Sequence, residues 1–257
     1  TVSGLTLTGN ALANVLGGTQ GVDVLNGGLG ADFMEGGGGD DTYFVDDAAD
    51  AVVEAANAGF DTVYASVSHV MAANVERAYL TVGGQALTGN ALNNVMGGSN
   101  GADTLNGGAG ADFMQGWTGD DTYFVDNVQD AVVEASGEGF DTVYASVTYA
   151  LSANVERGFL TVGGQTLTGN AMNNVLGGSQ GNDVLNGGAG ADFMQGWTGD
   201  DTYFVDDVQD AVVEAANEGF DTVFASVSYT LAANVERGYL TVGGFTLTGN
   251  ALGNVLG

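Results

Sequence analysis

The chain has 257 residues, of which 32 are Asp or Glu and only three are Lys or Arg, so its formal net charge is −29. This charge excludes nucleic acid as a natural partner, because phosphate recognition needs basic side chains, and it disfavours an anionic membrane surface. An apolar fraction of 44%, with 9 Tyr and 12 Phe residues, excludes a disordered acidic tail, and the absence of Cys excludes disulfides and thiolate metal sites.

A long internal repeat runs through the whole chain. The segment LTGNALANVLGG at residues 7–18 recurs in similar form at 87–98 and 167–178, which gives an 80-residue period, and residues 241–257 match 1–17. Repeats of this kind form arrays in which each unit buries its apolar face against its neighbour. We therefore predict three modules and one partial repeat, at residues 1–80, 81–160, 161–240 and 241–257.

The first half of each module has a finer period of nine. In the third module, segments 178–186, 187–195 and 196–204 each read as a glycine-rich turn, an Asp, any residue and a large apolar residue. The sixth position of the nonapeptide holds Asp or Asn at a constant spacing of nine. These position-six residues are Asn14, Asp23, Asp32, Asp41 and Asp50; Asn94, Asp103, Asp112, Asp121 and Asp130; and Asn174, Asp183, Asp192, Asp201 and Asp210.

The nonapeptide pattern predicts a coil made of two turns and two short parallel strands. Strands of successive coils then lie about 4.8 Å apart, the apolar residue of each strand points inward, and Asp side chains two nonapeptides apart stack along one edge. Two carboxylates about 5 Å apart repel by about 3 kcal/mol at an effective dielectric near 20, so a cation must lie between them. Carboxylate and carbonyl oxygens suit Ca²⁺ better than the smaller Mg²⁺.

These segments resemble the glycine-rich nonapeptide of RTX proteins, the hemolysin-type calcium-binding repeat. The 80-residue unit is similar to the tandem modules of large secreted bacterial RTX proteins, and the resemblance covers essentially the entire chain. It implies an all-β fold: a right-handed parallel β-roll or β-solenoid of three 80-residue repeats, with several Ca²⁺ ions in the turns of each module.

The resemblance also implies how the calcium ligands are paired. In the family, each ion lies between the position-six side chain of one turn and that of the turn two nonapeptides later. In the first module this joins Asp23 to Asp41 on one edge, and Asn14, Asp32 and Asp50 on the other. We expect weaker or missing sites where Asn supplies no charge and where the turn before Asp50 lacks glycine. The equivalent sets are Asp103 with Asp121 and Asn94–Asp112–Asp130, then Asp183 with Asp201 and Asn174–Asp192–Asp210.

Residues 42–85 contain no nonapeptide but are rich in Val, Tyr, Phe and Thr, which favours strands. We interpret them as longer coils that continue the same parallel sheets around an apolar rather than metal-filled interior. The alternative is a small separate β subdomain between two rolls. A short helical turn around residues 72–76 is also compatible with the sequence.

Three residue types outside the nonapeptides have competing interpretations. Arg77 and its equivalents are the only basic side chains, and we expect an ion pair with Glu54, Glu76 or a neighbouring Asp rather than an anion ligand role. Trp117 and Trp197 replace a glycine of the first module, and we expect them to cover a solenoid groove, with stacking on sugars as the alternative. Two roles are compatible with Asp61, Asp141 and Asp221: binding a further ion, or stabilising a turn or strand edge.

Catalysis is not expected. The chain has no Cys or Lys nucleophile, and its single histidine, His69, is replaced by Tyr in the other modules. Paired carboxylates serve glycosidases, but here metal spacing accounts for the Asp residues, and three copies of one active site would be unusual.

The sequence thus predicts a calcium-dependent extracellular structural repeat protein, of the adhesin, surface-layer or filament-forming kind, which folds on binding Ca²⁺ outside the cell. The alternative is a non-catalytic RTX accessory region of a secreted enzyme or toxin. We expect either a mature fragment or a protein exported without an N-terminal signal, by type I secretion. Expected partners are further copies of the chain, joined end to end, and a cell-surface or carbohydrate contact, without membrane insertion.

Overall fold

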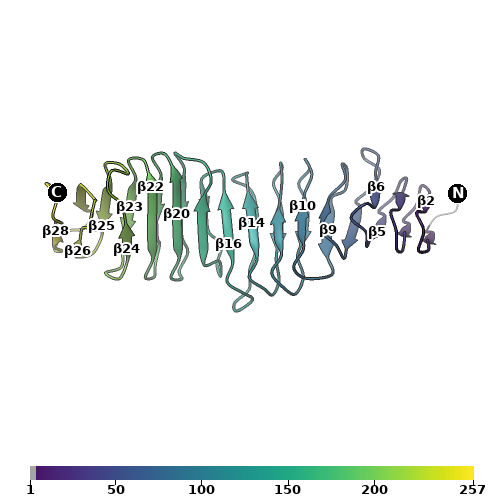
Figure 1. Ribbon diagram of the computed structural model, residues 1–257, viewed down its shortest axis with the longest axis horizontal. Helices are drawn as coiled ribbons and strands as arrows, with labels where there is room; N and C mark the ends of the chain where they lie inside the picture. Colours follow the sequence, from purple (N-terminus) through teal and green to yellow (C-terminus); the bar gives the residue numbers. More distant parts are fainter. Residues whose placement is uncertain (1–3) are drawn as a thin grey trace. The chain divides into compact units, whose positions relative to one another are not determined.

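The computed structural model describes residues 4–257, and within this range the chain forms strands and turns but no helix. The chain divides into two compact units, Thr1–Val133 and Glu134–Gly257. Figure 1 shows short strands stacked side by side in both units.

In the first unit the odd-numbered and even-numbered strands separate into different sheets, and all pairings are parallel. Alternate strands along the chain therefore lie on opposite faces, and two strands make one coil of a parallel β-solenoid. The odd strands form one sheet: β1 (Thr6–Thr8), β3 (Val24–Asn26), β5 (Thr42–Val45), β7 (Thr62–Ala65), β9 (Arg77–Leu80), β11 (Val95–Gly97), β13 (Phe113–Gln115) and β15 (Ala131–Val132). The even strands form two groups: β2 (Val15–Gly17), β4 (Phe33–Glu35) and β6 (Ala51–Val53), then β8 (His69–Val70), β10 (Ala86–Thr88), β12 (Thr104–Asn106) and β14 (Thr122–Val125).

The second unit repeats this arrangement. Its odd strands pair in parallel in one sheet, and its even strands form two groups. The odd strands are β17 (Tyr149–Ala150), β19 (Thr166–Thr168), β21 (Val184–Asn186), β23 (Thr202–Val205), β25 (Thr222–Ala225), β27 (Arg237–Leu240) and β29 (Val255–Leu256). The even strands are β16 (Thr142–Ala145), β18 (Arg157–Leu160), β20 (Val175–Gln180), β22 (Phe193–Thr198) and β24 (Ala211–Val213), with β26 (Tyr229–Thr230) and β28 (Leu247–Thr248) in a separate pair.

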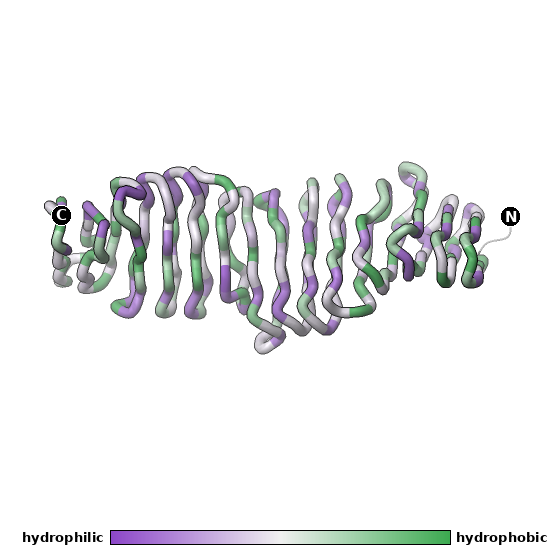
Figure 2. The backbone as a smooth tube through the Cα atoms, viewed as in Figure 1, coloured by the Kyte–Doolittle hydropathy of each residue, from purple (hydrophilic) through white to green (hydrophobic). Residues whose placement is uncertain are grey.

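The core lies inside the coils and consists of one residue per nonapeptide strand. Leu7 aligns with Leu25, and Leu25 with Tyr43, so successive strands of a sheet are two nonapeptides apart. Leu25, Met34 and Tyr43 are all fully buried. Hydrophobic and hydrophilic residues accordingly alternate along the tube within each unit (Figure 2). These findings confirm the predicted two-nonapeptide coil and its inward apolar position.

Residues 42–85 continue the solenoid, as the continuous-coil interpretation predicted. Tyr43 pairs with Val63, and Val63 with Ala78, in the same parallel sheet. The first of these coils advances the chain by 20 residues and the second by 15 residues, so only the first is longer than two nonapeptides. The separate subdomain and the helical turn are both wrong: the chain turns sharply at Asn74, which has a φ of 68°.

Within residues 4–257, each 80-residue repeat supplies nine strands, from β1 to β9 in the first repeat. Nine is an odd number, so the next repeat begins on the opposite sheet. In the first unit, β3 therefore lies in the odd-strand sheet, whereas its repeat equivalent β12 lies beside β10 and β14. Equivalent Asp residues of successive repeats consequently lie on opposite edges of the coil.

Candidate calcium sites

Each position-six residue immediately precedes a strand and is held by a tight turn. The side chains of Asp23, Asp32 and Asp41 are almost completely buried. Glycine is required in these turns because the side chains occupy the adjoining space: a methyl group added to Gly27 would collide with the Asp32 carboxylate. The next residue, Gly28, has a φ of 79°, which glycine adopts without strain.

The structure brings together the all-Asp pairs that the sequence predicted. The backbone N–H of Asp23 donates to Asp41 Oδ1 at 2.7 Å. The same hydrogen bond joins Asp103 to Asp121 at 2.7 Å and Asp183 to Asp201 at 2.7 Å. Each carboxylate thus lies above the position-six residue of the preceding coil, which places acid next to acid along the edge.

The second predicted set is also aligned, but its members have different partners. The N–H of Asn14 donates to Asp32 Oδ1 at 2.6 Å, and that of Asp32 to Asp50 Oδ1 at 2.9 Å. The other oxygen of Asp50 accepts from the N–H groups of Asp46 and Asp47, at 3.1 and 3.2 Å, in place of a glycine-rich turn. Both Asp50 oxygens therefore already bind backbone, and the weaker metal site expected there remains a prediction.

The position-six Asn residues close turns with their amide groups. Asn94 Oδ1 accepts from the N–H of Asn90 at 2.8 Å, and its Nδ2 donates to the carbonyl of Val75 at 3.1 Å. The side chain of Asn174 makes equivalent contacts with Asn170 and Val155. Both ends of each amide have protein partners, so the structure gives these residues a structural role, and their assignment as calcium ligands remains a prediction.

Several position-six carboxylates have one oxygen without a hydrogen-bond partner in the described part of the chain. Among the described residues, Asp32, Asp112 and Asp192 each have a buried Oδ2 without a hydrogen-bond partner, as do Asp41 and Asp201. An unsatisfied buried charge is strongly unfavourable, and each of these oxygens is a hard ligand of the kind Ca²⁺ takes. The residues present therefore fit the predicted ion.

Burial perturbs the acidity of these groups. It raises the pKa of Asp112 and Asp192 to about 6 each, with help from the charges of Asp130 and Asp210 respectively. Burial and the neighbouring charges of Asp221 and Asp183 raise the pKa of Asp201 to about 7. The cause is burial first and like-charge repulsion second, and a divalent cation would relieve both effects.

The row of acids extends beyond the nonapeptides, which sequence spacing alone did not predict. The N–H of Asp41 donates to Asp61 Oδ1 at 2.8 Å, and that of Asp61 to Glu76 Oε2 at 2.8 Å. We call the residues that precede the odd strands of the first unit, from β3 onward, the odd-strand column, and those that precede its even strands the even-strand column. The odd-strand column is Asp23, Asp41, Asp61, Glu76, Asn94, Asp112 and Asp130. The even-strand column is Asn14, Asp32, Asp50, Ser68, Gln85, Asp103 and Asp121.

Asp61 and Glu76 each lie directly before a strand, and this position is their only signal in the sequence. To align them with Asp41 from the sequence, one would need to know the lengths of the two irregular coils. The odd-strand column is thus acidic at every position except Asn94, whereas Ser68 and Gln85 interrupt the even-strand column. In the second unit, Asp201, Asp221 and Glu236 continue a row in the same way.

Glu54 has a different environment from the one predicted. Its carboxylate is buried beside Asp41 and Asp61 and accepts a hydrogen bond from the Tyr43 hydroxyl. Arg77 does not pair with it: the guanidinium lies over the Phe60 ring, 4.6 Å from its centroid, and no carboxylate of the described residues lies within ion-pair distance. Arg157 and Arg237 likewise lie over Phe140 and Phe220, at 4.1 Å each. The predicted ion pair is therefore wrong.

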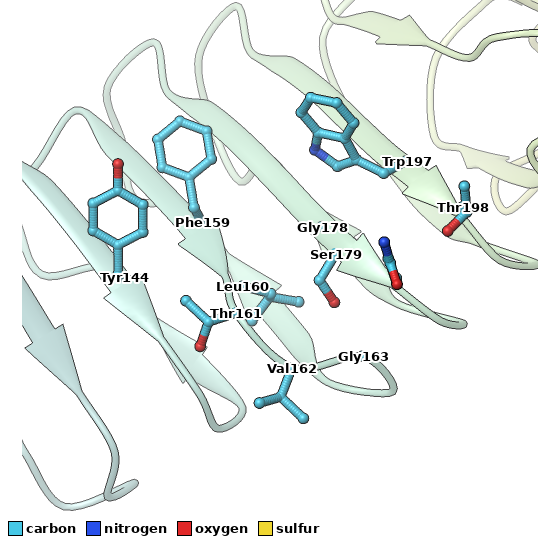
Figure 3. Close-up of a pocket in the computed structure, with 11 residues that line it drawn as sticks. Tyr144, Phe159, Leu160, Thr161, Val162, Gly163, Gly178, Ser179, Trp197 and Thr198 are labelled. Atoms are coloured by element: carbon cyan, nitrogen blue, oxygen red, sulfur yellow. The ribbon is translucent and has the colours of Figure 1, made fainter.

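A surface hollow of about 740 Å³ lies on the outer face of the second unit (Figure 3). Tyr144 and Phe159 stack there with their ring centroids 5.5 Å apart, and Trp197 extends from the strand beyond Gly177. Trp197 is about half exposed, at 48%. It forms one wall of this open hollow.

Parallel coils with glycine turns and aligned buried carboxylates define the class of a calcium-binding β-roll. Three segments of the chain, residues 8–51, 88–130 and 168–203, match the family model of the RTX calcium-binding nonapeptide repeat. The chain therefore carries the RTX calcium-binding nonapeptide repeat, as its resemblance predicted, and Ca²⁺ is its cofactor. A comparison with curated proteins gives no match. Within the described residues, no helix is long and apolar enough to cross a membrane.

Proposed function

We propose that the chain is a structural repeat protein that folds on binding Ca²⁺ outside the cell, as part of an adhesin, a surface layer or a filament. The observation that carries this proposal is the row of buried carboxylates, such as Asp41 and Asp61, each with an oxygen that no described residue satisfies. The chain supplies only three basic side chains against 32 acids, so the neutralising charge must come from outside the protein.

This requirement makes Ca²⁺ a folding switch. Cytosolic Ca²⁺ is scarce, so the repelling carboxylates keep the chain unfolded and exportable by type I secretion. Outside the cell, Ca²⁺ is abundant and binds between the coils. Repulsion of about 3 kcal/mol per carboxylate pair is comparable, over a few pairs, to the whole net stability of a domain.

A non-catalytic role is part of the proposal. The acidic groups of the columns are engaged by backbone N–H groups of neighbouring coils, as in the contacts of Asp41 with Asp23 and of Asp61 with Asp41. The single histidine, His69, has a pKa lowered by burial. These features support a scaffold in which repeated carboxylates hold metal.

Self-association is a further part of the proposal. It is supported by flat aromatic ladders on the outer faces: Phe44 and Tyr64 stack at 5.5 Å, and in the second unit Phe204 and Phe224 also at 5.5 Å. Phe44 and Phe204 are each 39% exposed. Outward-facing ladders of this kind suit contact with another copy of the chain.

Electron microscopy of the purified protein with and without Ca²⁺ tests this function. We expect fibres or layers of uniform width with Ca²⁺ and none after EGTA. A calcium-loaded monomer at high protein concentration would contradict self-assembly. That result would favour the alternative, a non-catalytic accessory region of a secreted enzyme or toxin.

A carbohydrate contact is a second candidate function, and the hollow in Figure 3 favours it. The rings of Phe159 and Trp197 flank the bare strand at Gly177, while Ser179 and Thr161 supply hydroxyl groups at the rim. Aromatic faces beside hydrogen-bonding groups suit a pyranose ring. Glycan-array binding should be lost in Trp197→Ala and kept in Val208→Ala, a change at an exposed apolar residue outside the hollow. Equal binding by both variants would contradict this role.

A further inference from the structure

Three carboxylates converge where the 18-residue coils give way to the 20-residue coil. Each of Asp41, Glu54 and Asp61 offers a ligand oxygen, and these oxygens all lie within 4.8 Å of one another. The three side chains are almost completely buried, because their exposed fractions are 1%, 7% and 0%. Only Asp41 belongs to a nonapeptide; Glu54 follows β6 and Asp61 precedes β7.

Every member of this triad has one oxygen held by the protein and the other oxygen open. Asp41 Oδ1 accepts from the N–H of Asp23 at 2.7 Å, and Asp61 Oδ1 from the N–H of Asp41 at 2.8 Å. Glu54 Oε1 accepts from the Tyr43 hydroxyl. Among the described residues, the second oxygens of Asp41, Glu54 and Asp61 have no hydrogen-bond partner. The protein therefore fixes the orientation of three carboxylates and leaves three ligand positions to something else.

The second unit contains the same constellation. Asp201, Glu214 and Asp221 offer ligand oxygens within 4.8 Å of one another, and all three are buried. The Tyr203 hydroxyl again contacts Glu214, and the open oxygens include Asp201 Oδ2 and Glu214 Oε2 among the described residues. In the second module of the sequence, the 80-residue repeat places Asp121, Glu134 and Asp141 at the equivalent positions.

Among the described residues, no basic side chain forms an ion pair with Asp41, Glu54 and Asp61 or with Asp201, Glu214 and Asp221. The nearest Arg in sequence is Arg77 in the first unit and Arg237 in the second, and each guanidinium lies over a Phe ring. A glycine keeps the site open, because a methyl group on Gly36 would collide with Asp41 Oδ2 and the Tyr43 hydroxyl. The triad therefore concentrates up to three negative charges in a buried space, where its hydrogen-bond partners among the described residues are neutral: two backbone N–H groups and a phenol.

We propose that each triad binds one Ca²⁺ ion, at a site distinct from those of the nonapeptide turns. Ligand oxygens on opposite sides of Ca²⁺ lie about 4.6–5.2 Å apart, since Ca–O distances are about 2.3–2.6 Å. The triad oxygens lie within 4.8 Å of one another, close enough for one ion to contact all three. Three carboxylates suit Ca²⁺ better than Mg²⁺, which keeps several waters and usually binds through only one or two carboxylates. The site goes beyond the proposed function because two of its three ligands lie outside the RTX motif.

The ion has a specific structural task at this position. Asp41 ends the nonapeptide coils, Asp61 belongs to the 20-residue coil, and Glu54 comes from the connection between them. The Asn74 side chain holds the backbone of that connection by donating to the Glu54 carbonyl at 2.8 Å. A cation bound by all three carboxylates joins the nonapeptide roll to the coils without nonapeptides.

Counting bound calcium in two matched variants tests the proposal. Glu214→Gln removes a charge from the triad but keeps an oxygen that can accept from Tyr203, whereas Glu218→Gln removes the same charge from a partly exposed residue four positions away. After gel filtration in CaCl₂, elemental analysis should find one Ca²⁺ fewer per chain in Glu214→Gln than in wild type, and no loss in Glu218→Gln. An unchanged count in Glu214→Gln would overturn the proposal.

A second measurement uses the wild-type protein and does not depend on whether a variant folds. Crystals grown in CaCl₂ should show anomalous scattering peaks within bonding distance of Asp41, Glu54 and Asp61, and of the equivalent triad in the second unit. Peaks in the nonapeptide turns with none at the triads would overturn this inference and leave the proposed calcium-dependent function intact. The absence of peaks from both the turns and the triads would contradict this inference and the proposed calcium-dependent function alike.

Discussion

The nonapeptide coils and the coils of residues 54–85 share the odd-strand sheet of the first unit but are stabilised in different ways. Nonapeptide turns bury carboxylates such as Asp32 with an oxygen that no described residue satisfies, so they depend on an external ion. The later coils add side-chain packing: Tyr64 stacks on Tyr79 at 5.6 Å, and Arg77 lies over Phe60. The comparison shows that a coil without the glycine consensus keeps the parallel register, here with aromatic side chains stacked along its strands.

The two regions nevertheless keep one feature in common, the acid before the strand. Asp23, Asp41, Asp61 and Glu76 follow one another at intervals of 18, 20 and 15 residues, and each backbone N–H donates to the next carboxylate. The strand pairing, rather than a fixed repeat length, therefore determines which residues share an edge. Coil length varies in the turns, where an added or deleted residue does not disturb the parallel hydrogen bonds.

The largest effect is expected from removing a nonapeptide carboxylate. Asp103→Ala removes a charged side chain aligned with Asp121, whereas Asn94→Ala removes a neutral amide that already has protein partners. Titration calorimetry should show a calcium affinity about tenfold or more lower for Asp103→Ala, and a much smaller change for Asn94→Ala. Equal losses in the two variants would show that the predicted pairing is wrong.

Acid should act on both regions, because burial raises the pKa of Asp61 and Asp201 to about 7 each and that of Asp112 to about 6. These values exceed the ordinary 3.8, so the metal-free folded state binds protons more tightly than the unfolded state. The metal-free folded state should therefore become more stable as pH falls from about 7 to about 4. Over the same range, protons compete with Ca²⁺ for the carboxylates, so calcium affinity should fall. Circular dichroism of metal-stripped protein should show more β structure at pH 5 than at pH 8, and calorimetry a weaker calcium affinity at pH 5. The opposite order in either measurement would contradict the burial of these groups.

The smallest effect is expected from the packing of the later coils. Arg237→Ala removes the contact with Phe220, where the guanidinium carbon lies 4.1 Å from the ring centroid. An exposed contact of this type contributes about 0.5–1 kcal/mol, so calcium-saturated protein should lose that much stability in urea unfolding. The number of bound Ca²⁺ ions should not change. A lost ion would mean that Arg237 supports a metal site rather than packing alone.

The sequence predicted the nonapeptide half in detail because its period fixes both the inward apolar residue and the acid at the edge, as Leu25 and Asp23 show. The sequence also predicted that residues 42–85 continue the sheets. It did not predict the lengths of these coils, since no motif marks their turns. The role of Glu54 was missed for the same reason. Its partners Asp41 and Asp61 lie before and after it at intervals that are not multiples of nine, and only the three-dimensional register brings them together.

The central claim is that burying these carboxylates requires an external cation. Circular dichroism of the purified chain, titrated with CaCl₂ and then with excess EGTA at neutral pH, tests it most directly. The account predicts an unfolded spectrum without Ca²⁺, a cooperative gain of β structure as Ca²⁺ is added, and its loss with EGTA. A cooperatively folded β spectrum in excess EGTA would contradict the claim, because the protein would then stabilise its columns of buried carboxylates without a metal ion.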